Sequence, residues 1–245
     1  MSRVIFMLTL RQLAGQKRTL LMLLFAALPI AIAIIYRLAA NEPNRVDFVA
    51  NGLLSGLVVA IVLPLTALIF GTAALGAEIE DGTAVYLLAK PIPRWRIVLP
   101  KVLAAWLATA VLVFVAAAVS GGIAIAGEPG GSLVPAFAIA VLAGSLVYCS
   151  AFVMLSILTS RALIVGLIYV FLWEAVINGL FKGTRFLSVR QATLGIADAL
   201  TNVSARDFEA RLNGSTAVIL MAVGTALTLW VAVRALQRFE IGEST

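Results

Sequence analysis

Residues 97–118 read IVLPKVLAAWLATAVLVFVAAA, and Lys101 is the only charged side chain among them. A helix needs about 20 apolar residues to cross the ~30 Å hydrocarbon core of a bilayer. Lipid offers no hydrogen-bond partner to a free backbone N–H or C=O group, so a spanning segment of this kind has to be helical. The stretch therefore predicts a transmembrane α-helix.

Five other segments have the same apolar character. Together with the first they predict six transmembrane helices, at residues 20–39, 52–75, 97–118, 134–158, 162–181 and 216–235. The longest polar stretch between them, residues 182–215, is too short and too mixed in character for a soluble domain. We therefore expect an all-α integral membrane protein in which residues 1–245 form a single transmembrane domain.

The composition supports a membrane protein and excludes several other classes. Of the 245 residues, 62% are hydrophobic and 12% are charged, whereas soluble domains carry about 25% charged residues. The formal net charge is +6. However, the basic residues lie between apolar spans and form no continuous patch, which argues against a protein that binds nucleic acid. The chain has no histidine, one cysteine and no GxxxxGK[ST] motif. We therefore expect no metal, no cofactor and no ATP site of its own.

The distribution of lysine and arginine predicts the orientation. If the N-terminus is cytoplasmic, the inner segments hold eleven of the 18 basic residues and the outer segments hold seven. Short cytoplasmic loops carry an excess of Lys and Arg. We therefore expect a multi-pass protein of the cell (inner) membrane with both termini in the cytoplasm.

Residues 1–19 precede the first predicted span and mix apolar with polar side chains. Wound as a helix, they place Phe6, Leu10 and Leu13 on an apolar side and Thr9, Gln12 and Gln16 on a polar side. This pattern is typical of a helix that lies in the membrane interface. The alternative is that these residues are only a positively charged flank of the first span, without a role of their own. The sequence favours neither interpretation.

The densest charge lies in the loop at residues 77–96 and just after it. Three acids come first, Glu78, Glu80 and Asp81, and four bases follow, Lys90, Arg94, Arg96 and Lys101. The positive-inside bias explains the bases, but acidic residues contribute little to topology. The acids therefore need another explanation.

A short helix accounts for the order of these residues. Asp81 and Gly82 suit a helix N-terminus, where acidic charge is favourable, and Pro91 stops a helix. The helix would present Val85 and Leu88 to the cytosol, and an apolar helix face of this kind fits a groove on a partner protein. The alternative is a plain connecting loop, and we favour the docking helix.

The loop resembles that of permeases of the type-2 ABC exporter family. The matching residues are Glu78, Glu80, Asp81, Gly82, Thr83, Leu87, Leu88, Pro91, Arg94 and Lys101. A second match, to a bacterial subgroup of that family, comprises Trp173, Glu174, Gly183, Thr184, Arg185, Leu187, Ser188, Val189, Arg190 and Gln191. The chain departs from the family pattern at Pro93 and Pro100, where serine and a small residue are usual.

The resemblance implies a non-catalytic transport subunit. Permeases of this family pair as homo- or heterodimers and sit on two separate ATPase subunits, which bind ATP and Mg. The resemblance assigns coupling to the ATPase to Glu78, Glu80, Asp81, Gly82, Thr83, Val85, Leu88, Pro91, Arg94 and Lys101. The acids are expected to hold the loop geometry, with Arg94 or Arg96 as their partner. The apolar spans favour export of a hydrophobic or amphipathic substrate.

Glu174 lies well inside the fifth predicted span, with Asn178 four residues later on the same helical face. An ionisable side chain at the centre of a membrane helix costs about 2.5–3.5 kcal/mol, so it has to face protein or water. One hypothesis is that Glu174 lines or gates the transport path. The other, which we favour, is a structural tie to the segment that follows. Tyr148 and Cys149 are interpreted as packing residues.

The first part of residues 182–215 is too apolar for a free external loop. We expect it to turn back into the outer leaflet, as the external re-entrant helices of the family do. Its polar residues include Arg185, Ser188 and Arg190, and Arg185 or Arg190 is expected to pair with Glu174.

Two other classes of function stay open on the sequence alone. A stand-alone secondary transporter or channel would show an internal repeat and several buried charges along a path, and neither is evident here. A membrane scaffold without transport is also compatible. Co-purification with a nucleotide-binding subunit discriminates among the three.

Overall fold

The computed structural model describes residues 2–15, 17–39, 45–80, 93–127, 130–177, 182–204 and 206–238. These residues form helices joined by turns, with no strand among them, so the all-α fold class is confirmed. In chain order the elements are α1 (Ser2–Ala14), α2 (Lys17–Ala39), α3 (Arg45–Asp47), η1 (Phe48–Val62), α4 (Leu63–Glu80), α6 (Trp95–Ile125), α7 (Leu133–Leu158), α8 (Ala162–Ile168), η2 (Tyr169–Ile177), η3 (Lys182–Leu187), α10 (Val189–Leu200) and α11 (Gly214–Gln237). Elements η1 and η2 are π-helices, and η3 is a 3-10 helix.

Among the described residues, five helices are long and apolar enough to cross a bilayer. They cover Met22–Ala39, Arg45–Gly76, Trp95–Ile125, Leu133–Leu158 and Gly214–Gln237. The second of them is one continuous helix that runs from α3 through η1 into α4. Within the predicted span at 162–181, the described residues contain a shorter apolar helix, Ala162–Glu174. The described part of the chain therefore has five long candidate spans, whereas the sequence predicted six spans in the whole chain.

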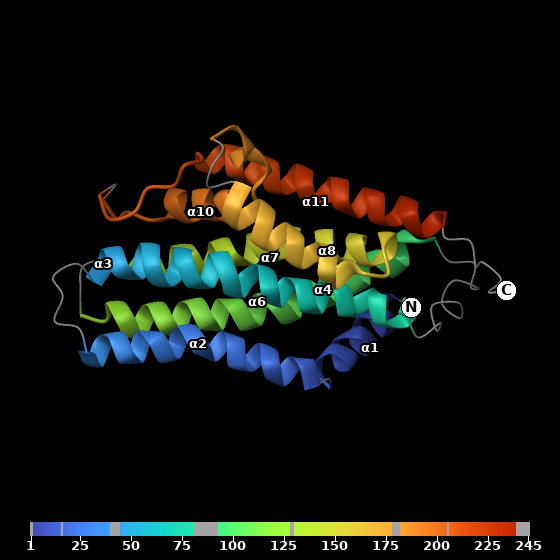
Figure 1. The fold of residues 1–245 in the computed structure, drawn as a ribbon, viewed down its shortest axis with the longest axis horizontal. Coiled ribbons are helices and arrows are strands. Elements are labelled where there is room, and N and C mark those ends of the chain that lie inside the picture. The colour runs from blue at the N-terminus through green and yellow to red at the C-terminus, as the bar shows by residue number, and fades with distance from the viewer. Residues whose placement is uncertain are drawn as a thin grey trace.

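The helices form a bundle with α6 and α7 at its centre (Figure 1). Helix α4 packs against both of these, α2 lies along α6 at one edge, and α11 lies along α7 at the other edge. Helix α10 packs on α7 and α11, in the half of the molecule away from α1 (Figure 1). Of the four largest fully buried side chains among the described residues, Tyr148, Phe137 and Phe152 belong to α7 and Lys101 belongs to α6.

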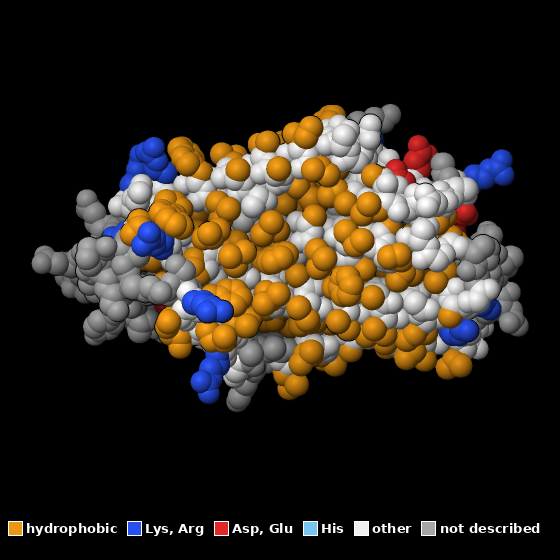
Figure 2. Space-filling model, turned by 180° about the vertical axis from the view of Figure 1, so that it is seen from behind, with side chains coloured by type: hydrophobic (Ala, Val, Ile, Leu, Met, Phe, Trp, Pro, Cys, Tyr) orange, Lys and Arg blue, Asp and Glu red, His pale blue; other side chains and the backbone are white. Residues whose placement is uncertain are grey.

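The outer surface of the bundle is apolar where lipid would surround it. Helices α2, α8 and α11 expose large hydrophobic side chains, among them Leu24, Ile35, Ile164, Ile219 and Leu227. Hydrophobic side chains cover the middle of the face shown in Figure 2, and Lys and Arg gather toward its two ends. This distribution matches an apolar bilayer core between two charged interfaces.

Small residues permit the closest helix contacts. A Cβ atom added at Gly144 of α7 would collide with the Thr193 side chain of α10 and approach Leu63 Cδ2 to 3.1 Å. By contrast, a Cβ atom added at Gly122 of α6 would meet nothing within 4 Å. Glycine at 144 is therefore needed for α10 to pack on α7, whereas glycine at 122 is not needed for packing.

We expect Gly144→Ala to lower the free energy of unfolding by about 1–3 kcal/mol, because overpacking of a close contact costs about this much. Gly122→Ala is the matched control, and it should be neutral or stabilising by up to about 1 kcal/mol. Thermal unfolding of both variants in detergent measures the difference. Equal stability of the two variants would contradict the close approach of α10 to α7.

Candidate functional site

The predicted coupling loop leaves the bundle between two residues that form an ion pair. Lys101 Nζ donates to Glu78 Oε1 at 2.7 Å and to the backbone oxygen of Ala74, also at 2.7 Å. Ala74 and Glu78 lie one turn apart on the same face of α4, and Lys101 lies in the second turn of α6. The ion pair therefore joins the end of α4 to the beginning of α6.

The two partners of this ion pair are buried to different degrees. The side chain of Lys101 is 1% exposed and that of Glu78 is 24% exposed. A buried ammonium group needs a charged or hydrogen-bonding partner, and here Glu78 and the Ala74 carbonyl supply it. Sequence reasoning proposed Arg94 or Arg96 as the partner of the acids, whereas the structure adds Lys101 as a partner of Glu78.

Most other residues of the predicted coupling set lie outside the described residues, namely Asp81, Gly82, Thr83, Val85, Leu88 and Pro91. Glu80 is the last residue of α4, and Arg94 directly precedes α6, where its backbone oxygen accepts from Ile97 N at 3.0 Å. The structure thus fixes the two ends of the loop.

Two tryptophan–arginine pairs flank the same end of the bundle. The Arg96 guanidinium lies 5.2 Å from the Trp95 ring at the start of α6. The Arg234 guanidinium lies 5.2 Å from the Trp230 ring near the end of α11. Tryptophan is enriched at membrane interfaces, and these pairs mark one interface at the end of the bundle that holds α1.

The faces of α1 differ in part from those expected. Leu13 is buried, as the predicted apolar side requires, but Thr9 is buried as well, and its hydroxyl donates to Ile5 O at 2.9 Å. Met7 and Leu8 are exposed. Thr9, which the sequence placed on the polar side, is thus buried because its hydroxyl is satisfied by its own helix and the side chain then packs like an apolar residue.

Glu174 is buried in η2, with 4% of its surface exposed, and is bound by donors from three elements. Its Oε1 atom accepts from Tyr148 Oη and Tyr169 Oη, both at 3.1 Å, and from the backbone nitrogen of Val189 at 2.9 Å. Its Oε2 atom accepts from the Ser188 hydroxyl at 2.5 Å. These contacts place the carboxylate at the N-terminus of α10, where backbone N–H groups and the helix dipole favour negative charge.

The predicted tie between Glu174 and the following segment is present, but its donors differ from those predicted. The described contacts of Glu174 include no arginine side chain, and Arg190 contributes its backbone nitrogen at 3.5 Å. The Nε atoms of Arg185 and Arg190 are buried without a hydrogen-bond partner among the described residues. Asn178 lies outside the described part of the chain.

Sequence reasoning missed both tyrosines and the cap of α10. Tyr148 was interpreted as a packing residue, yet a buried tyrosine hydroxyl needs a partner, and the nearby Glu174 is one. Ser188 is the N-cap of α10, and its oxygen accepts from the backbone nitrogen of Gln191 at 3.1 Å. The pattern Ser188-Val-Arg-Gln191 has the spacing of a capping box, and this signal was available in the sequence.

A polar cavity of about 340 Å³ lies beside Glu174. Its walls come from η1, η2, α10 and the segment before α11, and its polar side chains are Asn51, Ser55, Glu174, Arg190, Gln191, Glu209 and Arg211. Asn51 ties this region to the segment before α11, since its amide donates to Asp207 O at 2.8 Å. The described residues contain no cluster of three or more His, Cys, Asp or Glu side chains that could hold a metal ion.

Comparison with known proteins identifies the family. The sequence profile described as ABC-2 family transporter protein matches residues 5–191. This range runs from α1 into the first turn of α10, so it covers more than half of the chain and includes both the Glu78–Lys101 pair and Glu174. A search of curated proteins finds no match. The chain therefore belongs to the ABC-2 transporter family, as a membrane component with multiple transmembrane helices.

Proposed function

We propose that the protein is the permease subunit of an ATP-driven ABC exporter in the cell (inner) membrane. The observation that carries this proposal is the family match over residues 5–191. In the proposed assembly two permease chains, identical or different, sit on separate ATPase subunits that bind ATP and Mg. The predominance of apolar surface in the spans supports a hydrophobic or amphipathic substrate.

The proposed topology has six membrane-spanning helices with both termini in the cytoplasm. The sixth comprises α8 and η2, whose exposed side chains Ile168, Phe171 and Leu172 suit a lipid environment. The segment of η3 and α10 is proposed to re-enter the outer leaflet. The support for it is the packing of α10 against α7 and α11 and the tie from Glu174 to its N-terminus.

The proposed coupling element is the loop at residues 77–96, which contacts the ATPase. Its support is the Glu78–Lys101 pair, which holds the two ends of the loop together and transmits a displacement of the loop to both α4 and α6. The cytoplasmic residues Asp81, Gly82, Thr83, Val85, Leu88 and Pro91 would form the contact, and Glu78, Glu80, Arg94 and Lys101 would hold its base.

Co-purification tests the proposal directly. The tagged chain should bring down a P-loop subunit encoded in an adjacent reading frame, and the complex should hydrolyse ATP in lipid vesicles. Stimulation of hydrolysis by members of a panel of lipids and hydrophobic drugs would identify the substrate class. If the chain alone transports a solute without any ATPase, the stand-alone transporter is correct and the proposal fails.

Cysteine labelling tests the topology. In a Cys149→Ser background, a cysteine at Asn202 should react with a membrane-impermeant maleimide in intact cells. Cysteines at Ser2 and Glu243 should react only after the cells are opened, because both termini are expected inside. Labelling of either terminus in intact cells would reverse the proposed orientation.

Leu88→Asp should uncouple the permease from its ATPase. An unpaired carboxylate in an apolar groove is costly, so we expect at least a tenfold loss of ATPase co-purification with unchanged yield of the permease. Leu200→Asp is the matched control, since Leu200 is an exposed leucine at the end of α10. Normal ATPase binding and normal transport by Leu88→Asp would remove the docking role of this residue.

A further inference from the structure

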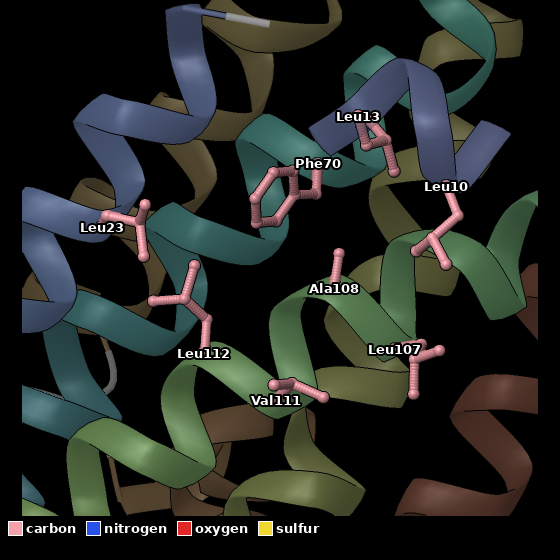
Figure 3. Close-up of a pocket in the computed structure, with 8 residues that line it drawn as sticks. All are labelled: Leu10, Leu13, Leu23, Phe70, Leu107, Ala108, Val111 and Leu112. Atoms are coloured by element: carbon pink, nitrogen blue, oxygen red, sulfur yellow. The ribbon is translucent and has the colours of Figure 1, made fainter. Parts of the chain in front are cut away.

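An apolar cavity of about 350 Å³ lies between the N-terminal helix and the bundle. Figure 3 shows its lining side chains, which come from four helices: Leu10 and Leu13 from α1, Leu23 from α2, Phe70 from α4, and Ala108 and Val111 from α6. The described residues that line it are all hydrophobic. A cavity of this composition does not suit water, because a bound water needs two to four polar partners.

The cavity opens to the side of the bundle. Leu13 and Phe70 are buried and form its floor, whereas Leu23 is 54% exposed and Val111 is 56% exposed at its rim. Helices α2 and α6 are candidate membrane spans. In the membrane this rim therefore adjoins lipid hydrocarbon. Helix α2 begins at Lys17, and Leu23 lies roughly 9 Å deeper at 1.5 Å per residue. The opening is therefore at the depth of acyl chains in the leaflet on the N-terminal side.

The size of the cavity suits one hydrocarbon chain. An engineered apolar cavity of about 150 Å³ binds benzene, so a cavity of 350 Å³ has room for roughly a dozen carbon atoms by the same ratio. Four helices, α1, α2, α4 and α6, line the cavity. A hydrocarbon chain that enters from the membrane therefore suits its size and its apolar lining.

The charge of α1 indicates the headgroup. The charged residues of Ser2–Ala14 are Arg3 and Arg11, and no acid lies in this segment. Arg11 is exposed in the last turn of α1, next to the lining residue Leu10. An arginine at a membrane interface attracts the phosphate of an anionic lipid.

We propose that this cavity binds one acyl chain of an anionic phospholipid from the leaflet on the N-terminal side, with its phosphate at Arg11. The bound chain fills the space between α1 and the helices α2, α4 and α6, so the lipid is a structural part of the contact between α1 and the bundle. The site is separate from the Glu78–Lys101 pair and from Glu174.

Native mass spectrometry of the complete chain, equilibrated with phosphatidylglycerol or phosphatidylcholine, tests the proposal. Wild type should retain one tightly held phosphatidylglycerol. Ala108→Phe should reduce its retention at least fivefold by filling the cavity. Ala118→Phe is the matched control, because Ala118 is a half-buried alanine of α6 outside the cavity, and it should retain the lipid as wild type does.

Two further comparisons locate the headgroup and the chain. Arg11→Gln should lower the preference for phosphatidylglycerol over phosphatidylcholine at least threefold, whereas Arg3→Gln, roughly 12 Å away along α1, should not. In vesicles of phosphatidylglycerol, a phospholipid with a diazirine on its acyl chain should label residues 107–112 of wild type, a result that does not depend on the folding of any variant.

Equal retention by Ala108→Phe and Ala118→Phe would overturn the proposal. Loss of a permease dimer in Ala108→Phe without loss of lipid would instead assign the cavity to a second chain and also overturn it.

Discussion

Replacing Glu78 with alanine should destabilise the protein more than replacing its partner Lys101 with methionine. Glu78→Ala leaves an ammonium group that is 1% exposed and whose one other partner among the described residues is the Ala74 carbonyl. Breaking a buried pair in this way costs about 3–5 kcal/mol. Lys101→Met leaves a carboxylate that is 24% exposed and can be hydrated, while the methionine fills the space of the lysine stem, so we expect a loss of about 1–2 kcal/mol.

The double variant is the decisive measurement for this pair. Glu78→Ala with Lys101→Met removes both charges, and it should be more stable than Glu78→Ala alone, because no unpaired charge stays buried. Thermal unfolding in detergent, monitored by tryptophan fluorescence, gives the stability of each of the three variants. Glu209→Ala, an exposed carboxylate, serves as a control and should change stability by less than about 0.5 kcal/mol. Strictly additive losses in the double variant would show that the two charges do not interact.

Replacing Glu174 should release α10 from the bundle. Glu174→Ala strands two tyrosine hydroxyls, the Ser188 hydroxyl and the backbone nitrogen of Val189, and a buried donor without an acceptor costs about 1–3 kcal/mol. We expect a total loss of about 3–4 kcal/mol after relaxation. Glu174→Gln should lose about 1–2 kcal/mol, because its amide oxygen still accepts whereas its amide nitrogen cannot.

Hydrogen exchange distinguishes this local effect from a general loss of stability. The amides of α10 should exchange at least tenfold faster in Glu174→Ala, whereas those in the middle of α6 should change little. Tyr169→Phe is the matched control: it removes one donor without stranding another group, so we expect a loss below about 1 kcal/mol. Unchanged exchange in α10 would mean that Glu174 does not hold this helix, and the transport-path hypothesis would regain support.

The sequence predicted the elements whose signal is strong and local. Apolar runs such as 97–118 and 134–158 correspond to α6 and α7, because a helix in lipid leaves little choice of structure. Within the predicted span at 162–181, hydropathy gave no indication that Tyr169–Ile177 is wound as a π-helix. Glu174 was singled out by the cost of burying a carboxylate, and in the structure it is buried and accepts hydrogen bonds from α7, η2 and α10.

The partners of the singled-out residues could not be predicted, because they depend on tertiary packing. The loop motif contains both Glu78 and Lys101, but it gave no indication that they form an ion pair. In the structure they lie on facing turns of α4 and α6. Arginine was the obvious partner for Glu174 by charge. Glu174 is bound instead by the N-terminus of α10, whose partial positive charge arises from several backbone N–H groups and not from one residue. The sequence indicates this N-terminus only through the capping pattern at Ser188 and Gln191.

The continuous helix from Arg45 to Glu80 connects two distant polar contacts across the molecule. Near one end it carries Glu78, bound to Lys101, and near the other end it carries Asn51, bound to the carbonyl of Asp207. The two residues are roughly 40 Å apart along this helix, so a tilt of about 5° about one end would move the other by about 3.5 Å. That displacement exceeds the 2.8 Å length of the Asn51 hydrogen bond, so a rotation of this size about the Glu78 end would be sufficient to break it.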